Sequence, residues 1–173
     1  MEPSLRLPVT TPDGTAAESV TLLVVDVDGH RCALPAHVVV EIHPAVQLAR
    51  LPDAPEVVVG MVNRRGRPLP VLDLRRRLGL PGRTLRLEDR LVVLALPDRE
   101  VALLVDAAVD MLTVPAETVD DAVAGAAEAV RSSGVAVLPD GLLVILDVQG
   151  FLSSGESAAL DEALQQALAA ASR

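Results

Sequence analysis

The sequence predicts a mainly β protein built from two small barrels and a short C-terminal α-helix. Short apolar runs rich in β-branched residues alternate with turn signals along most of the 173 residues, as in small barrels. The pattern of the first half returns in the second half, which indicates an internal duplication. Three leucines near the C-terminus recur every four residues, as on one face of a helix. Each half therefore supplies about five strands to a pair of barrels.

The chain begins with a segment that lacks any apolar period. Residues 1–18 contain three prolines and the Asp13-Gly14 pair, and we expect them to form a flexible tail. The first hairpin follows. Residues 20–27 form an apolar strand, Asp28-Gly29 is a strong two-residue turn signal, and residues 31–34 form the returning strand.

The next predicted hairpin carries positive charge at its turn. Apolar runs at 57–62 and 69–72 flank the sequence Arg64-Arg65-Gly66-Arg67, as in two strands joined by a tight turn that contains glycine. Asp73 follows the second strand, where its carboxylate can accept from the first free amides of a short helix. Gly79 can end that helix.

The same order returns after a linker at Pro81-Gly82. Residues 101–103 align with residues 32–34 at an offset of 69. Residues 134–147 align with residues 60–73 at an offset of 74, without a gap and with glycine and aspartate at matching ends.

Two of the predicted strands, at 91–96 and 142–146, are apolar on both faces. A strand that is apolar on both faces is typical of a sheet that is buried on both sides. We therefore expect the two halves to pack against each other.

The C-terminal segment has the signature of an amphipathic helix. Ser153 and Glu156 have the spacing of a capping box. Leu160, Leu164 and Leu168 then form one apolar stripe, which predicts a helix that lies on the barrels.

Composition excludes several functions. Phe151 is the only aromatic residue and lysine is absent, so base stacking, aromatic-lined peptide grooves, Schiff bases and phosphate-loop lysines are excluded. The net charge of −9 argues against general attraction to nucleic acid or anionic membrane. The single cysteine, Cys32, and the lack of a signal-peptide core or a long apolar span indicate a soluble cytoplasmic protein.

Positive charge is concentrated in one segment. Between Arg64 and Arg90, nine arginines stand against three acidic residues. Such a segment is either a solvated face or a docking patch for an acidic partner. Within it, the run from Arg75 to Arg77 either extends a docking surface or faces water, and both readings stay open.

Residues that carry enzymatic chemistry are few. Asp73, Asp106 and Asp147 each end an apolar strand, and an enzyme would bring them together as acid, base or metal ligands. Strand-end aspartates that cap helical turns explain them more simply. The three histidines and Cys32 lack the spacing of a zinc motif, so we expect no metal and no cofactor.

Several motifs in this order and spacing resemble the CheW-like coupling proteins of bacterial chemosensory arrays. The resemblance runs from Val20 to about Leu152 and is carried by Asp28-Gly29, Ala33-Leu34-Pro35, Val40-Glu41-Ile42, Leu51-Pro52, Asn63-x-Arg65-Gly66, Pro70-Val71-x-Asp73-Leu74-Arg75, Leu104-Val105-Asp106 and Leu146-Asp147. It implies two intertwined five-stranded Src-homology-3-like barrels. The domain then covers residues 19–154, with halves at about 20–80 and 89–152, and the C-terminal helix covers residues 155–173.

The resemblance also implies a function. Proteins of this family are non-enzymatic adaptors that join the cytoplasmic tip of a chemoreceptor to the regulatory domain of the histidine kinase CheA. The implied location is the cytoplasm, with recruitment to membrane-associated receptor arrays but no membrane insertion and no nucleic acid. A ligand-binding or hydrolytic barrel that uses the strand-end aspartates, and a self-associating scaffold with unpaired strand edges, are the alternatives.

The family's partner-binding positions fall on Val39, Glu41, Gly60, Arg65 and Gly66. Arg64, Arg67 and Arg75 are candidates for accessory docking, because arginine forks pair with carboxylates and are enriched at interface hot spots. The chain departs from the family at Arg64, where an aliphatic residue is usual, and at Pro68, which suits an edge strand.

Overall fold

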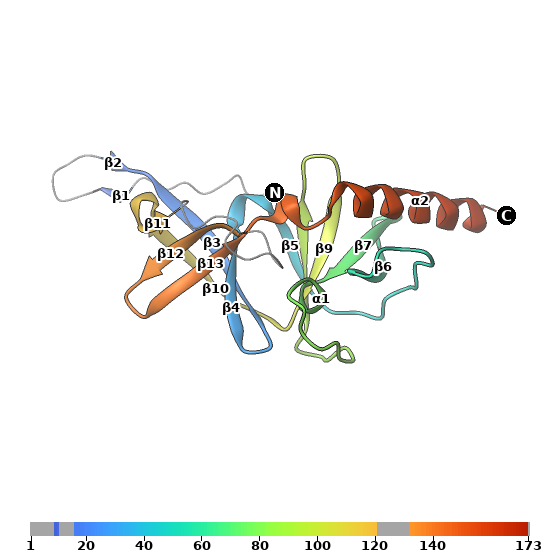
Figure 1. Cartoon of the computed structure of the whole chain (residues 1–173), viewed down its shortest axis with the longest axis horizontal. Helices are drawn as coiled ribbons and strands as arrows, with labels where there is room; N and C mark the ends of the chain where they lie inside the picture. The colour runs from blue at the N-terminus through green and yellow to red at the C-terminus, as the bar shows by residue number, and fades with distance from the viewer. Residues whose placement is uncertain (1–8, 11–15, 121–131, 173) are drawn as a thin grey trace.

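The computed structural model describes residues 9–10, 16–120 and 132–172 (Figure 1). It confirms the predicted fold class, with two large β-sheets and a C-terminal helix. The five-stranded sheet, here called the first barrel, contains β5 (Val39–Pro44), β6 (Val58–Arg64), β7 (Arg67–Asp73), β8 (Arg90–Ala95) and β9 (Glu100–Val105) in the order β5-β8-β9-β7-β6.

The six-stranded sheet, here called the second barrel, lies beside the first (Figure 1). It contains β3 (Ser19–Val27), β4 (His30–Pro35), β10 (Ala107–Pro115), β11 (Val119–Asp120), β12 (Ser132–Leu138) and β13 (Gly141–Leu146) in the order β10-β3-β4-β13-β12-β11. The helices among the described residues are α1 (Leu74–Arg77) and α2 (Ser154–Ala171), with 3-10 turns η1 (Ala36–Val38), η2 (Ala116–Thr118) and η4 (Val148–Gly150).

Each barrel is completed by a hairpin from the other half of the chain. The β3–β4 hairpin belongs to the first half in sequence but pairs with β10 and β13 of the second barrel. The β8–β9 hairpin belongs to the second half but pairs with β5 and β7 of the first barrel. This exchange is the intertwining that the resemblance implies.

The strand registers reproduce the duplication seen in the sequence. In the parallel pair of the first barrel, Val71 lies opposite Ala102. In the parallel pair of the second barrel, Ile145 lies opposite Ala33. Val71 and Ile145 are 74 positions apart, and Ala33 and Ala102 are 69 positions apart. The two parallel strand pairs therefore join equivalent residues of the two halves.

The irregularities of the sheets repeat in the same way. The break in register between Val39 and Glu41 returns between Ala108 and Asp110, 69 positions later. The break between residues 58 and 60 returns between residues 132 and 134, 74 positions later. Bulges are local features that re-aim a strand, so their recurrence shows that the two halves share one backbone plan.

The largest apolar core lies between the two barrels. It joins side chains of β3 and β4, such as Val25 and Leu34, to side chains of β8 and β9, such as Val92 and Leu103. Each barrel also has a smaller core of its own. Of the strand predicted at residues 91–96, residues 91–94 are therefore buried on both faces, whereas Ala95 and Leu96 are half-buried.

The same prediction for residues 142–146 is wrong. Leu142 is 72 % exposed and Val144 is 40 % exposed, whereas Leu143 and Ile145 are buried. Alternate residues of a strand point to opposite faces. β13 therefore buries its inner face, whereas its outer face is buried only at Leu146, which lies in the core between the barrels.

Helix α2 begins with the predicted capping box. The Ser153 hydroxyl accepts from the Glu156 amide at 3.1 Å, and the Glu156 carboxylate accepts from the Ser153 amide at 2.9 Å. Leu160 is fully buried in the shared core, but Leu168 is 52 % exposed. Only part of the predicted stripe packs, since the C-terminal end of α2 runs past the first barrel (Figure 1).

The N-terminal segment holds a short ladder of β1 (Val9–Thr10) and β2 (Ala16–Ala17). Residues 1–8 and 11–15 lie outside the described residues, so the flexibility of the tail stays a prediction, as do the domain boundaries. In the part of the chain that the structure describes, no helix has the length and apolar character needed to cross a membrane.

Candidate functional site

The charged turn between β6 and β7 is a two-residue hairpin loop. Arg65 and Gly66 both have positive φ angles, of 53° and 81°, the backbone that a type I′ hairpin turn requires. A Cβ at position 66 would meet nothing within 4 Å, so the glycine serves the backbone conformation. The side chain of Asn63 supports the turn, because its Oδ1 accepts from the Gly66 amide at 2.8 Å.

Glu41 joins the two edge strands of the first barrel. It lies on β5, and its Oε1 is 3.0 Å from Arg65 Nη2 and 3.1 Å from Arg64 Nη2, both carried by the β6–β7 hairpin. His43 Nε2 lies 2.6 Å from its other oxygen. The hydrogen bond with His43 and the charges of both arginines hold the pKa of Glu41 below its usual value. The two edges of the sheet are thus linked by an ionic cluster at the surface.

Arg64 stands at the centre of this cluster. It also forms an ion pair with Glu100, at the start of β9. A hollow of about 550 Å³ lies on one side of Arg64, lined by Glu41, His43, Val62 and Leu69 among others. A second hollow, of about 490 Å³, is lined by Arg64, Arg67, Asp161 and Leu164 among others, between the hairpin and α2. The hairpin therefore presents arginine between two concave surfaces.

Gly60 is placed by a close approach of the backbone. Ala49 and Met61 exchange two backbone hydrogen bonds of 2.8 Å, which hold residues 48–49 against β6. A Cβ at position 60 would lie 2.6 Å from the Ala49 carbonyl oxygen and 2.9 Å from Leu48 Cβ. Only glycine fits this position without moving the backbone.

The structure brings together some of the predicted partner-binding residues but not all. Glu41, Arg65 and Gly66 meet at the hairpin turn. Gly60 is buried inside β6. Val39 packs against the core between the barrels, on the face of β5 opposite the barrel's own core. The binding role of these five residues stays a prediction.

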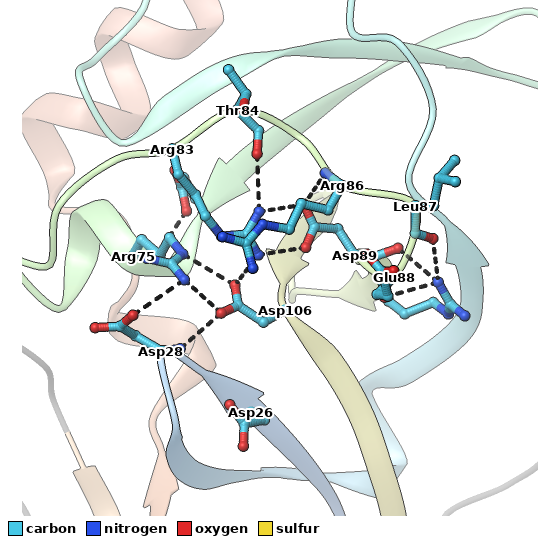
Figure 2. Close-up of polar contacts among 12 residues, drawn as sticks. Asp26, Asp28, Arg75, Arg83, Thr84, Arg86, Leu87, Glu88, Asp89 and Asp106 are labelled. Carbon is cyan, nitrogen blue, oxygen red and sulfur yellow. Dashed lines mark hydrogen bonds and ion pairs between the residues drawn. The ribbon is translucent and has the colours of Figure 1, made fainter.

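Arg75 is buried, and its side chain points toward Asp28 and Asp106 (Figure 2). Its side chain is only 10 % exposed, and its guanidinium pairs with Asp106. The reading that residues 75–77 face water is therefore wrong for Arg75. A docking role would need an exposed guanidinium, which Arg75 does not offer.

The three strand-end aspartates have separate tasks. Asp73 accepts from the Arg75 amide at 2.9 Å and caps α1, and Asp147 accepts from the Gln149 amide at 3.1 Å and caps η4. Asp106 belongs to an ion-pair cluster. Among the described residues, no group of three or more histidine, cysteine or acidic side chains is arranged to hold a metal ion.

Sequence reasoning missed the contacts that give the site its shape. The partners of Glu41 include Arg64 and His43, and the partner of Arg64 is Glu100, 36 positions away. The sequence held no direct signal for the contact with Glu100, because Glu100 reaches Arg64 through the pairing of the β8–β9 hairpin with the first barrel.

Acid is expected to destabilise the fold. Burial raises the pKa of Asp106, Asp89 and Glu156, but hydrogen bonds and charges from their arginine partners outweigh it and leave each pKa below its usual value. A carboxylate with a lowered folded pKa stabilises the fold fully above its unfolded pKa of about 4, and this contribution is lost as pH falls through the folded pKa. Asp73 acts in the opposite direction, since burial raises its pKa.

We expect the urea concentration at the unfolding midpoint to decrease as the pH is lowered from about 6 to about 3. Equilibrium unfolding followed by far-ultraviolet circular dichroism measures this, since the chain lacks Trp and Tyr. Glu156→Gln should show a smaller fall than the unsubstituted protein. A midpoint that does not move over this range contradicts the role given to these ion pairs.

Comparisons with known proteins identify similar sequences and folds. A family model described as "CheW-like domain" matches residues 21–156. The chain is 32 % identical to "Chemotaxis protein CheW" of Bacillus subtilis (strain 168) over 82 % of this chain and 94 % of that protein. It is 31 % identical to "Chemotaxis protein CheW" of Klebsiella aerogenes over 70 % and 74 % of the two chains.

A solved structure shares the fold. It is described as the scaffolding protein TtCheW from Thermoanaerobacter tengcongensis, with a TM-score of 0.70 and 20 % sequence identity. The similarity covers 79 % of this chain and 90 % of that one.

Proposed function

The chain belongs to the CheW-like domain family, and on that premise we propose that it is a chemotaxis adaptor that couples receptors to the histidine kinase CheA. The match over residues 21–156 carries the proposal, because it spans both barrels. An adaptor needs exposed surfaces that recognise its partners, and it needs no reacting group. The function of such an adaptor depends on the placement of its docking surfaces and on its affinity for each partner.

The Glu41–Arg65 edge is proposed as one docking surface. Arg65 is 79 % exposed although it pairs with Glu41, so one face of its guanidinium remains open to a partner. The adjacent hollow combines this charge with apolar side chains such as Val62 and Leu69. Arginine beside an apolar depression is typical of interface hot spots.

The remaining predicted residues support this surface in different ways. Gly66 gives the turn its backbone, and Gly60 lets residues 48–49 pack against β6. Val39 lies at the start of β5, two positions before Glu41. We propose that Arg64 and Arg67 extend the surface toward α2, where both line the second hollow.

The proposed partners are the cytoplasmic tip of a chemoreceptor and the regulatory domain of a CheA-type kinase. The proposed location is the cytoplasm, at receptor arrays on the membrane. An enzymatic role is not part of the proposal, since Asp73, Asp106 and Asp147 each serve as a cap or an ion-pair partner.

Separate calorimetric titrations test the proposal. The first uses a fragment of a chemoreceptor tip and the second uses an isolated kinase regulatory domain, both taken from the organism that produces this protein. Saturable binding of both is expected, whereas absence of binding to either contradicts the adaptor role.

A further inference from the structure

Asp106 lies where the chain passes from β9 of the first barrel to β10 of the second. Its carboxylate accepts from Arg75 Nε at 3.1 Å and from Arg75 Nη2 at 2.6 Å, one bond to each oxygen. It also accepts from the Asp28 amide at 2.8 Å and lies 2.9 Å from Arg83 Nη2. Figure 2 shows these contacts converging on one carboxylate.

The partners of Asp106 come from three separate parts of the fold. Arg75 belongs to α1, which follows β7 of the first barrel. Arg83 belongs to the linker between α1 and β8. Asp28 belongs to the turn of the β3–β4 hairpin in the second barrel. One side chain therefore ties both barrels and the linker together.

The linker side of the cluster is itself held in place. Arg83 donates to both oxygens of Asp89, at 2.9 and 2.6 Å, and Asp89 also accepts from the Arg86 amide at 2.8 Å. Asp89 is only 2 % exposed. Arg75 in turn donates to the Pro81 carbonyl oxygen at 3.2 Å. The guanidinium groups of Arg75 and Arg83 are thus also held in place by partners other than Asp106.

The cluster has no ionic counterpart across the duplication. The offset of 69 places His37 at the position equivalent to Asp106, and the offset of 74 places Gln149 at the position equivalent to Arg75. His37 and Gln149 cannot form the bidentate carboxylate–guanidinium pair that Asp106 and Arg75 form. Phe151, two positions after Gln149, is an apolar member of the shared core.

The two kinds of contact between the barrels differ in what they specify. Burial of apolar surface is non-directional, so it favours contact between the barrels without by itself selecting one angle. A bidentate arginine–carboxylate pair constrains direction as well as distance. The pair is also shielded from solvent, with side chains only 10 % and 21 % exposed, so salt screens it weakly.

We infer that Asp106 is a positioning residue that fixes the orientation of the two barrels relative to each other. It thereby sets where the Glu41–Arg65 edge lies with respect to the second barrel. The consequence for partner geometry rests on the proposed function, but the orientation itself does not.

Pulsed dipolar spectroscopy tests this on the full chain without any partner. Spin labels are attached to Asp98→Cys, at the β8–β9 turn, and to Glu117→Cys, in η2, which are exposed and lie on different barrels. The native Cys32 stays unlabelled, because it is buried and burial raises the pKa of its thiol to about 12. We expect a narrow distance distribution that shifts or broadens in Asp106→Asn.

Two further variants make the test specific. Arg77→Gln removes the 2.8 Å ion pair between the first barrel and α2, and should leave the distribution unchanged. Arg75→Lys keeps the charge but removes the fork, and should broaden the distribution even if Asp106→Asn does not fold.

An unchanged distribution in a folded Asp106→Asn or Arg75→Lys variant overturns the inference, even if thermal stability falls, because the cluster would then only stabilise. If the distance distribution changes in these variants as expected but the partners do not bind the protein, the result counts against the proposed function and not against this inference.

Discussion

Gly60→Val is expected to lower the free energy of unfolding by about 3–5 kcal/mol, through overpacking and the loss of two backbone hydrogen bonds. A side chain at this position would meet the Ala49 carbonyl oxygen at 2.6 Å, and that oxygen belongs to backbone. Relief would require residues 48–49 to leave β6, which breaks the paired bonds between Ala49 and Met61. Urea unfolding of the purified variant measures the loss.

Gly82→Val is the matched control. A Cβ at position 82 meets nothing within 4 Å, and its backbone does not have the positive φ that disfavours side chains. It should change stability by less than about 0.5 kcal/mol. A Gly60→Val variant as stable as Gly82→Val would show that the contact between residues 48–49 and β6 is not constrained as described.

Arg65→Glu is expected to weaken binding to at least one partner by about 100-fold while leaving the fold intact. The side chain is 79 % exposed, so its ion pair with Glu41 contributes little to stability. The substitution reverses the charge that faces a partner and places it beside Glu41. Calorimetric titration with the receptor tip and with the kinase regulatory domain measures the effect.

Arg86→Glu separates a local effect from a change in net charge. It makes the same charge change at an exposed arginine of the linker, away from the β6–β7 turn. Its binding should stay close to that of the unsubstituted protein. If Arg65→Glu binds both partners as tightly as Arg86→Glu does, the docking role of the Glu41–Arg65 edge is wrong.

Much of the fold could be predicted because the duplication is visible in local sequence patterns of strands and turns. The offsets of 69 and 74 came from strand and turn signals. The structure confirms them, because Val71 pairs with Ala102 and the equivalent Ile145 pairs with Ala33. The turn at Asp28-Gly29 and the cap at Asp73 were also predictable, since backbone conformation and capping depend on near neighbours.

The burial of individual strands was less predictable. Hydrophobicity alone marked residues 142–146 as buried on both faces, but Leu142 lies in the open. Burial depends on which element covers a face, and that is decided by the arrangement of the barrels. The exposed Leu168 of α2 has the same explanation, because the helix outruns the surface on which it packs.

The ion pairs could not be predicted because they join distant parts of the chain. Asp106 accepts from Arg75, 31 positions away, and from the Asp28 amide, 78 positions away. Asp28 lies close to Asp106 because the β3–β4 hairpin pairs with β10 of the second barrel. Strand-end position suggested a cap for Asp106, and tertiary structure gave it a different role.

We propose that one chain holds a receptor and a kinase at the same time, which requires that the two partners do not share one surface. Analytical ultracentrifugation of this protein with the receptor tip fragment and the kinase regulatory domain tests it most directly. We expect a ternary species that contains all three components and that is depleted for Arg65→Glu but not for Arg86→Glu. Two binary complexes that displace each other, with no ternary species at saturating concentrations, would contradict it.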